Sequence, residues 1–167
     1  MLAENILSRR SIRKYKNEEV TKAQIEMLLE AGMLAPSAVN NRPWKFVVVT
    51  NRQKLEEMVD AFPYAKMLQS ASAAIVVCGL TERRFAKEYF PQDCSAATQN
   101  ILLQATSMGL GTCWCGVYPL EERIEKACEM LDIHDDSIPF NIIAVGIPDE
   151  EPKQRGFYEA EKVRWID

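Results

Sequence analysis

Residues 94–120 contain no charged side chain, in a chain of which 26% of the residues are charged. A gap of this length indicates burial. Apolar residues recur within it at helical spacing, at Ala97, Ile101, Ala105 and Met108. Gly109 and Gly111 then end the helix, and residues 112–117 are typical of a strand. We predict a central helix whose small side chains let other layers, and a second subunit, pack closely around it.

Apolar patterns predict further elements along the chain. A T-x-x-Q capping box, Thr21 with Gln24, marks the start of one helix. Residues 73–78 are apolar throughout, as in a strand covered on both faces. The predicted helices are residues 4–8, 21–34, 52–62, 64–70 and 120–131, and the predicted strands are 45–50, 73–78, 112–117 and 140–147. The polar and aromatic segment 81–92, with Phe85, Tyr89 and Phe90, could cover a pocket or pack on the core.

The last fifteen residues, 153–167, are polar but carry five large apolar side chains, Phe157, Tyr158, Val163, Trp165 and Ile166. Val163 and Trp165 alternate as they would in a strand. An arm this short cannot bury these groups by itself. We expect it to add to a sheet edge, either its own or a partner's.

Composition narrows the class of protein. The length of 167 residues fits one domain, residues 1–167. A net charge of −4 argues against nucleic acid as a partner. The start of the chain lacks the apolar run of a signal peptide, so we expect a cytoplasmic protein. Four polar residues interrupt the uncharged stretch: Thr98, Gln99, Asn100 and Gln104. We therefore expect no membrane span.

The cysteines do not suggest a disulfide framework. There are five, an odd number, and the chain has one histidine and no C-x-x-C. Because a zinc site needs grouped ligands, we expect no metal site. Cys113 and Cys115 would share one face of a strand, where such a pair is more often core than redox centre. His134 lies in an acidic loop and is not placed to activate a thiol.

Residues 9–14 contain four cations, Arg9, Arg10, Arg13 and Lys14. One interpretation is a solvated surface. The other is a phosphate clamp, in which guanidinium groups bind oxygen atoms in pairs and the Ser11 hydroxyl adds a donor. Lys153 and Arg155 could reach the same phosphate or remain solvated.

The loop at residues 35–44 contains two prolines, two asparagines and a serine beside a predicted core strand. Ser37, Asn40 and Arg42 could bind a planar polar ligand there. Alternatively, the asparagines only cap turns. Familiar nucleotide and nucleophile motifs do not occur: there is no P-loop and no G-x-S-x-G, and GLGTCWCG has Trp114 where a dinucleotide motif needs glycine.

Three blocks in order resemble the nitroreductase family of FMN-dependent NAD(P)H oxidoreductases. RRSIRKY (9–15) is similar to the family's R-x-S-x-R/K motif. APSAVNNRPWKFVVV (35–49) is similar to its P-S-x-x-N-x-Q-P-W loop and strand, with Arg42 in place of glutamine. DCSAATQNILLQATSMGLGTCWCGVYP (93–119) is similar to its central helix and glycine turn. A weaker block, FNIIAVGIP with Lys153 and Arg155, extends the resemblance over nearly the whole chain.

The resemblance implies an α+β fold with a central, mostly antiparallel sheet flanked by helices. It also implies a homodimer with the long central helix at the dimer interface. The C-terminal arm, residues 153–167, would be exchanged and dock on the partner subunit. Two FMN molecules would lie in the seam between the subunits.

The resemblance also implies roles for particular residues. The phosphate, the ribityl chain and the pyrimidine edge of FMN would be bound by Arg9, Arg10, Ser11 and Arg13. Contacts from the other subunit would come from Pro36, Ser37, Ala38 and Asn40, with Arg42 adding a positive charge. Backbone N–H groups near N5 and O4 would come from Cys115 and Gly116. Lys153 and Arg155 would complete the phosphate site.

The implied reaction is a ping-pong hydride transfer. NADH or NADPH would reduce the flavin and leave, and a small-molecule acceptor such as a nitroaromatic or quinone would take its place. No catalytic side chain is expected, because flavin N5 carries the hydride, and Arg13 would stabilise the negative charge of the reduced ring. Other flavin chemistry, such as dehalogenation or flavin cleavage, and a non-catalytic flavin-binding module stay open. The acceptor and the choice of donor also stay open.

Overall fold

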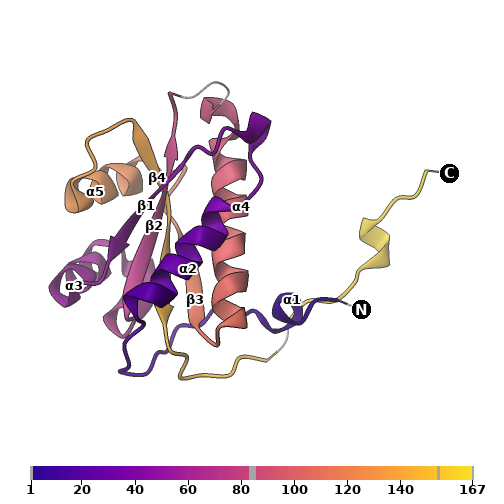
Figure 1. Cartoon of the computed structure of the whole chain (residues 1–167), viewed down its shortest axis with the longest axis horizontal. Coiled ribbons are helices and arrows are strands. Elements are labelled where there is room, and N and C mark those ends of the chain that lie inside the picture. The colour runs from indigo at the N-terminus through magenta and orange to yellow at the C-terminus, as the bar shows by residue number, and fades with distance from the viewer. Residues whose placement is uncertain (1, 83–85, 154, 167) are drawn as a thin grey trace.

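The computed structural model describes residues 2–82, 86–153 and 155–166 and has three layers (Figure 1). The middle layer is a sheet in the order β1-β2-β4-β3, in which each pairing is antiparallel. Its strands are Trp44–Val49 (β1), Ala73–Leu80 (β2), Gly111–Gly116 (β3) and Ser137–Gly146 (β4). Helices Lys22–Met33 (α2) and Ala86–Ser107 (α4) lie on one side, and Arg52–Ala61 (α3) and Glu121–Leu131 (α5) on the other. The predicted α+β fold with a flanked antiparallel sheet is confirmed.

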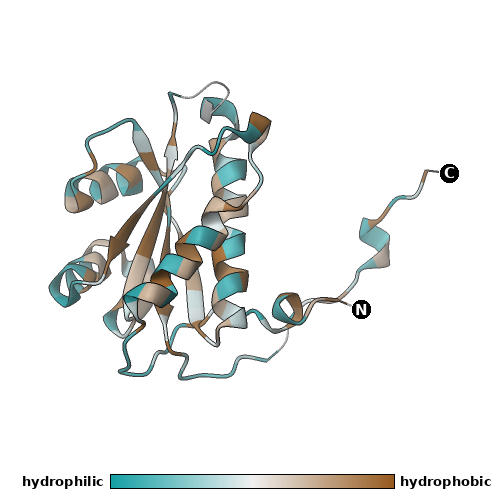
Figure 2. Ribbon diagram, in the orientation of Figure 1, coloured by the Kyte–Doolittle hydropathy of each residue, from teal (hydrophilic) through white to brown (hydrophobic). Residues whose placement is uncertain are grey.

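Each face of the sheet has its own core because successive strand residues point to opposite sides. Ile75, Val77 and Ile143 pack with α2 and α4. Val76 and Ile142 belong to the core under α3 and α5. Burial on both faces explains why β2 is apolar along its length (Figure 2).

The predicted central helix is α4. Its stripe residues Ala97, Ile101 and Ala105 are completely buried. The helix begins at Ala86, within the segment whose structure the sequence left undecided, and it includes Pro91. Phe90 from this segment is buried against β2, where a Cβ atom on Gly79 would lie only 2.2 Å from its ring. Phe85 lies outside the described residues.

The other elements follow the predictions within a few residues. The capping box of α2 is present: the Gln24 N–H donates to Thr21 Oγ1, and the Gln24 side chain accepts from the Thr21 N–H. The shorter elements are Glu4–Ser8 (α1) and the 3-10 helices Ala38–Asn40 (η1), Pro63–Gln69 (η2) and Ala160–Lys162 (η3). Thus the helix predicted at 64–70 is a 3-10 helix. Within the described residues, no helix has the length and apolarity needed to span a bilayer.

The C-terminal arm extends away from the three layers (Figure 1). Its described residues contain η3 but no strand, so the alternation of Val163 and Trp165 does not pair with a sheet edge of its own chain. The exposed fractions are 84% for Phe157 and 79% for Trp165. The part of the arm around Val163 and Trp165 is largely exposed, so among the described residues this alternation has no strand to pair with.

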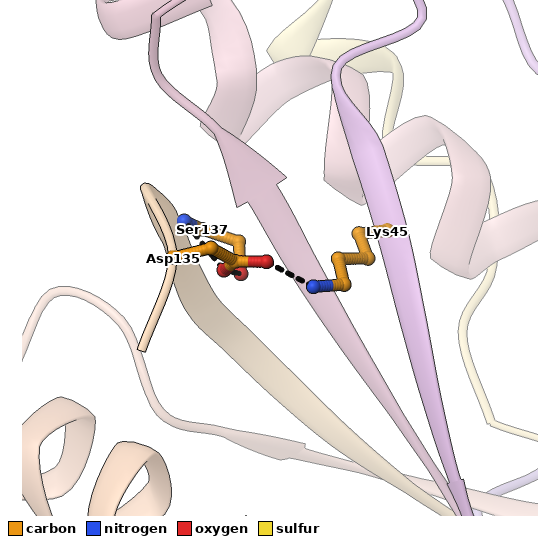
Figure 3. Close-up of polar contacts among 3 residues, drawn as sticks. All are labelled: Lys45, Asp135 and Ser137. Carbon is orange, nitrogen blue, oxygen red and sulfur yellow. Dashed lines mark hydrogen bonds and ion pairs between the residues drawn. The ribbon is translucent and has the colours of Figure 1, made fainter. Parts of the chain in front are cut away.

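A charged contact joins the outer strand β1 to the start of β4 (Figure 3). The Lys45 ammonium forms an ion pair with Asp135, and the same carboxylate accepts hydrogen bonds from the Ser137 N–H and hydroxyl. The hydrogen bond from Lys45, followed by those from Ser137, lowers the pKa of Asp135 from its ordinary 3.8 to about 2. The contact lies on the surface of the molecule.

Candidate functional site

A basic pocket of about 320 Å³ forms where the start and the end of the chain meet. We call it the cation pocket; it is lined by Arg9, Arg10, Ser11, Arg13, Glu150, Pro152, Lys153 and Arg155. The structure therefore brings together six of the residues predicted to bind the cofactor, although about 140 positions separate the two segments in sequence.

Backbone hydrogen bonds hold both segments in place at the sheet end. The Ile12 N–H donates to the Thr112 carbonyl of β3 at 2.8 Å, and the Asp149 N–H donates to the Lys14 carbonyl at 2.9 Å. Arg10 Nε donates to the Lys153 carbonyl at 3.2 Å and links the two segments directly. The position of the basic side chains is thus set by the sheet and not by a mobile tail.

The cation pocket has a strong excess of positive charge. Its one acidic side chain, Glu150, accepts the backbone N–H groups of Arg13 and Lys14. In the described part of the chain, none of the five basic side chains of the pocket forms an ion pair with a carboxylate. Arg10 and Arg13 also donate to the backbone carbonyls of Arg9, Lys153 and Ser11, but their positive charges and remaining donors, with the Ser11 hydroxyl, are available to a phosphate group.

Arg13 also lines a neighbouring pocket of about 440 Å³, which we call the Lys66 pocket. Its other lining residues come from η2 and the residues beside it: Pro63, Tyr64, Lys66, Met67, Gln69 and Ser70. Arg123 of α5 lies 3.9 Å from the Tyr64 ring centre and donates to the Gly116 carbonyl at 3.0 Å. The Lys66 pocket therefore adjoins the end of β3.

Sequence reasoning missed Lys66 and its neighbours in this pocket. Residues 63–70 contain no local binding motif, and only the approach of η2 to the N-terminal segment places Lys66 in the pocket that Arg13 lines. The one available signal was a single lysine in a short helical segment before a buried strand, and this signal is not specific.

The end of β3 presents one open backbone edge. Thr112 and Gly116 accept hydrogen bonds through their carbonyls from Ile12 and Arg123, which lie outside the sheet. In an antiparallel strand, alternate residues turn their N–H and C=O to the same side. The Gly116 N–H accordingly points to the open edge, whereas Cys115 faces β4, opposite Ile142. Of the two predicted backbone donors, the geometry favours Gly116.

The loop at residues 36–42 is held in an unusual conformation. Three residues other than glycine have positive φ angles, Val39 at 48°, Asn40 at 54° and Arg42 at 50°. The buried Asp93 carboxylate of α4 accepts the Ala38 N–H at 3.0 Å, and its other oxygen has no partner in the described structure. Such strain indicates that the loop has a defined shape.

Internal hydrogen bonds occupy Ser37 and Arg42 of this loop. The Arg42 N–H donates to Ser37 Oγ at 2.8 Å, and Arg42 Nη2 donates to the Met33 carbonyl at the end of α2 at 3.3 Å. A cation is favourable at this end of a helix. The arginine that replaces the family glutamine therefore has a structural contact of its own.

Loop 36–42 and the N-terminal segment that carries the arginines of the cation pocket lie near opposite ends of α4 (Figure 1). Asp93 contacts the loop, whereas Thr106 shares a surface hollow with Arg10 and Ile12. The thirteen residues from Asp93 to Thr106 span about 20 Å of helix. Within one chain, Pro36, Ser37, Ala38 and Asn40 are thus not brought to the basic residues.

The remaining polar candidates do not form a catalytic group. His134 is exposed and lies 2.7 Å from an Asp132 oxygen. In the described residues, no three His, Cys, Asp or Glu side chains converge as metal ligands.

Comparison with known proteins identifies relatives of this chain. The model of the Nitroreductase family matches residues 6–66 and 61–147. A relative from Methanothermobacter thermautotrophicus, assigned as an NADH dehydrogenase/NAD(P)H nitroreductase, is 44% identical over 96% of this chain and 84% of its own length.

Solved structures agree with the sequence comparison. A protein from Parabacteroides distasonis with the same assignment superposes with a TM-score of 0.91 at 42% identity, over 98% of this chain and 96% of its own. A nitroreductase from Desulfovibrio desulfuricans in complex with FMN has a TM-score of 0.84 at 29% identity, over 98% and 95% of the two chains. With its sheet, its basic pocket and these matches, the chain belongs to the nitroreductase family.

Proposed function

We propose that the protein binds FMN between two copies of the chain and transfers hydride from NADH or NADPH to a small acceptor. The observation that carries this proposal is the cation pocket, which shares its lining residue Arg13 with the Lys66 pocket. FMN has a matching chemistry, since its dianionic phosphate is linked to a planar polar ring. The names of the relatives, which include an NAD(P)H nitroreductase and an FMN complex, support the assignment.

The residues of the two pockets have different tasks in this proposal. In the cation pocket, Arg9, Arg10, Ser11, Lys153 and Arg155 bind the phosphate. Arg13 and Lys66 would bind the polar edge of the ring, and the Gly116 N–H would be available to it as a donor. When bound, FMN supplies the reversible acceptance of hydride, for which the protein needs no nucleophile. The two cations beside the ring favour negative charge on it and so promote reduction.

A second copy of the chain would complete the site. Loop 36–42 is about 20 Å of helix away from the basic residues of its own chain. In a two-fold dimer, one chain's loop can lie over the partner's pockets. The exposed aromatic arm supplies further surface for such an interface. The donor leaves before the acceptor binds, because both use the same face in a ping-pong cycle, and we propose nitroaromatics or quinones as acceptors.

The first test is a visible absorption spectrum of the purified protein before and after anaerobic addition of NADH or NADPH. We expect flavin bands that bleach with at least one donor and recover with a nitroaromatic or quinone. Flavin bands that persist with both donors would favour a binding module. Turnover confined to dehalogenation or flavin cleavage would favour other flavin chemistry, and a protein that takes up no FMN would refute the proposal.

Mixed dimers test whether the site is shared. One chain carries Arg9→Ala and Arg13→Ala, the other carries Ser37→Ala and Asn40→Ala, and each alone should lose FMN. A dimer of one chain of each kind has one intact site and should regain about half of the wild-type flavin content. No recovery in a stable mixed dimer would mean that each chain binds FMN with its own residues.

A further inference from the structure

Three sulfur atoms gather next to the Lys66 pocket, under the face of the sheet that α3 and α5 cover. Cys113 and Cys115 lie two residues apart on β3, so their thiols point to the same side. Cys115 Sγ lies 3.7 Å from Met67 Sδ, which belongs to η2. The exposed fractions are 2% for Cys113, 5% for Cys115 and 8% for Met67.

We propose that this sulfur cluster, Cys113, Cys115 and Met67, binds one Cu(I) ion per chain. Two thiolates and a thioether are ligands that soft monovalent cations prefer over oxygen or nitrogen donors. The absence of a group of three His, Cys, Asp or Glu ligands among the described residues argues against zinc, which usually takes four such ligands at a structural site. Cu(I) has no such requirement, because two or three sulfur atoms satisfy it.

The electrostatic environment favours an anionic metal centre. The Arg13 guanidinium lies close enough to Cys113 and Cys115 to interact with their charge, and Cu(I) displaces the protons of both thiols when it binds. A complex of Cu(I) with two thiolates carries one net negative charge, which Arg13 offsets.

The structure also provides a route for the ion. Met67 lines the Lys66 pocket, so its thioether lies between that pocket and the two thiols. In the protein without bound FMN, an ion that reaches this pocket meets the Met67 sulfur first and the Cys115 sulfur next. The other thiols are less suitable, because Cys78 and Cys94 are separately buried and burial raises the pKa of each to about 12.

A disulfide bond between Cys113 and Cys115 is less favourable than a shared metal ion. Two residues of extended strand separate the Cα atoms by about 6.6–6.8 Å, the upper limit for a disulfide bond. A metal ion between the two sulfur atoms does not need this short link. The geometry therefore favours a bridging ion over oxidation.

The proposal is tested by anaerobic competition of the full-length protein with bicinchoninate for Cu(I), followed by the absorbance of the Cu(I)–bicinchoninate complex. The wild-type protein should remove one Cu(I) per chain. Cys113→Ala and Cys115→Ala should weaken binding by about 100-fold or more, and Met67→Leu, which keeps the volume, by about tenfold. The matched control is Cys128→Ala, which removes the most exposed thiol and should bind as the wild type does.

X-ray absorption of the Cu(I)-loaded wild-type protein provides a second measurement that does not depend on the folding of variants. We expect only sulfur atoms in the first coordination shell. Nitrogen or oxygen ligands, wild-type protein that cannot compete, full binding by Cys113→Ala or lost binding by Cys128→Ala would each overturn the proposal. These results do not depend on flavin reduction, so they are separate from the test of the proposed function.

Discussion

Arg13 is the one described residue that lines both the cation pocket and the Lys66 pocket. Its backbone N–H donates to Glu150, its Nη1 donates to the Ser11 carbonyl, and among the described residues its side chain forms no ion pair. A single guanidinium can therefore act on both the phosphate side and the ring side of a bound flavin.

We predict that Arg13→Ala weakens FMN binding about tenfold or more and slows turnover, as expected for the loss of a charge-assisted hydrogen bond worth about 1.5–3 kcal/mol. Lys14→Ala removes the same charge from the neighbouring position, which lines neither pocket, and should have little effect. Fluorimetric titration of the apoprotein with FMN measures the affinity of each variant, and steady-state rates measure its turnover. Equal losses in the two variants would mean that only the net charge matters.

The surface contact of Asp135 with Lys45 makes stability depend on pH. Because folding lowers the pKa of Asp135 from 3.8 to about 2, its contribution is present above about pH 4 and is lost as the pH falls through about 2. Asp135→Asn should therefore lower the melting temperature near neutral pH, and the difference from the wild type should vanish at the acidic end. Thermal unfolding followed by circular dichroism at several pH values measures this. A difference that persists at pH 2 would assign the effect to lost hydrogen bonds.

At the scale of elements, α4 organises the molecule. Its buried stripe supports the sheet, its first turns hold loop 36–42 through Asp93, and its last turn lies beside the N-terminal segment. The positive φ angles of the loop cost free energy, and the Asp93 hydrogen bond is one of the contacts that offset this cost. The helix thereby determines the position of a segment that carries four predicted flavin contacts.

We predict that Asp93→Ala disorders loop 36–42 and weakens FMN binding, because the loss of a buried acceptor costs about 1–3 kcal/mol. Asp93→Asn keeps an oxygen where Oδ1 accepts the Ala38 N–H and should restore most of the affinity. Flavin titration together with the bound flavin's visible spectrum separates a local effect from unfolding. An asparagine variant as weak as the alanine variant would show that the loop needs the carboxylate charge.

At the scale of the whole molecule, the C-terminal arm exposes large apolar side chains to solvent in the single chain. Phe157, Tyr158, Trp165 and Ile166 lie on an arm that leaves the body of the protein, where Figure 2 shows apolar positions. Large apolar side chains gathered in one segment are typical of an interaction surface. We interpret the arm as a dimerisation element.

Deletion of residues 157–167 should convert the protein into monomers that retain little FMN, while Lys153 and Arg155 of the cation pocket remain. Sedimentation equilibrium and the ratio of flavin to protein absorbance measure the two effects. Replacing Lys162 and Arg164 by alanine is the matched control, since it changes the polar side of the arm and should leave the dimer intact. A truncated protein that stays dimeric with full flavin content would contradict this role.

Sequence patterns predicted the local structure well where the neighbouring residues decide it. The stripe of Ala97, Ile101 and Ala105 faces the core, and Thr21 and Gln24 form their capping box. Patterns were less informative where distant residues decide. Val163 and Trp165 do not pair with a strand of this chain, so of the two predicted sheet edges the partner's stays a prediction. For residues 81–92 the sequence left the structure open, and α4 includes Phe90. The family and the fold class were nevertheless predicted correctly from three separated motifs.

By itself, the sequence determined the periodic elements and the chemistry available to the protein: a clustered set of cations, a polar loop and a pair of strand cysteines. Each depends on short-range order, because periodicity and hydrogen-bonded caps involve residues a few positions apart. Only the tertiary structure decided which of these meet. It joined Arg13 to Lys66 and Cys115 to Met67, and it kept loop 36–42 at the far end of α4. Such long-range contacts depend on how the sheet and helices pack, which no local pattern encodes.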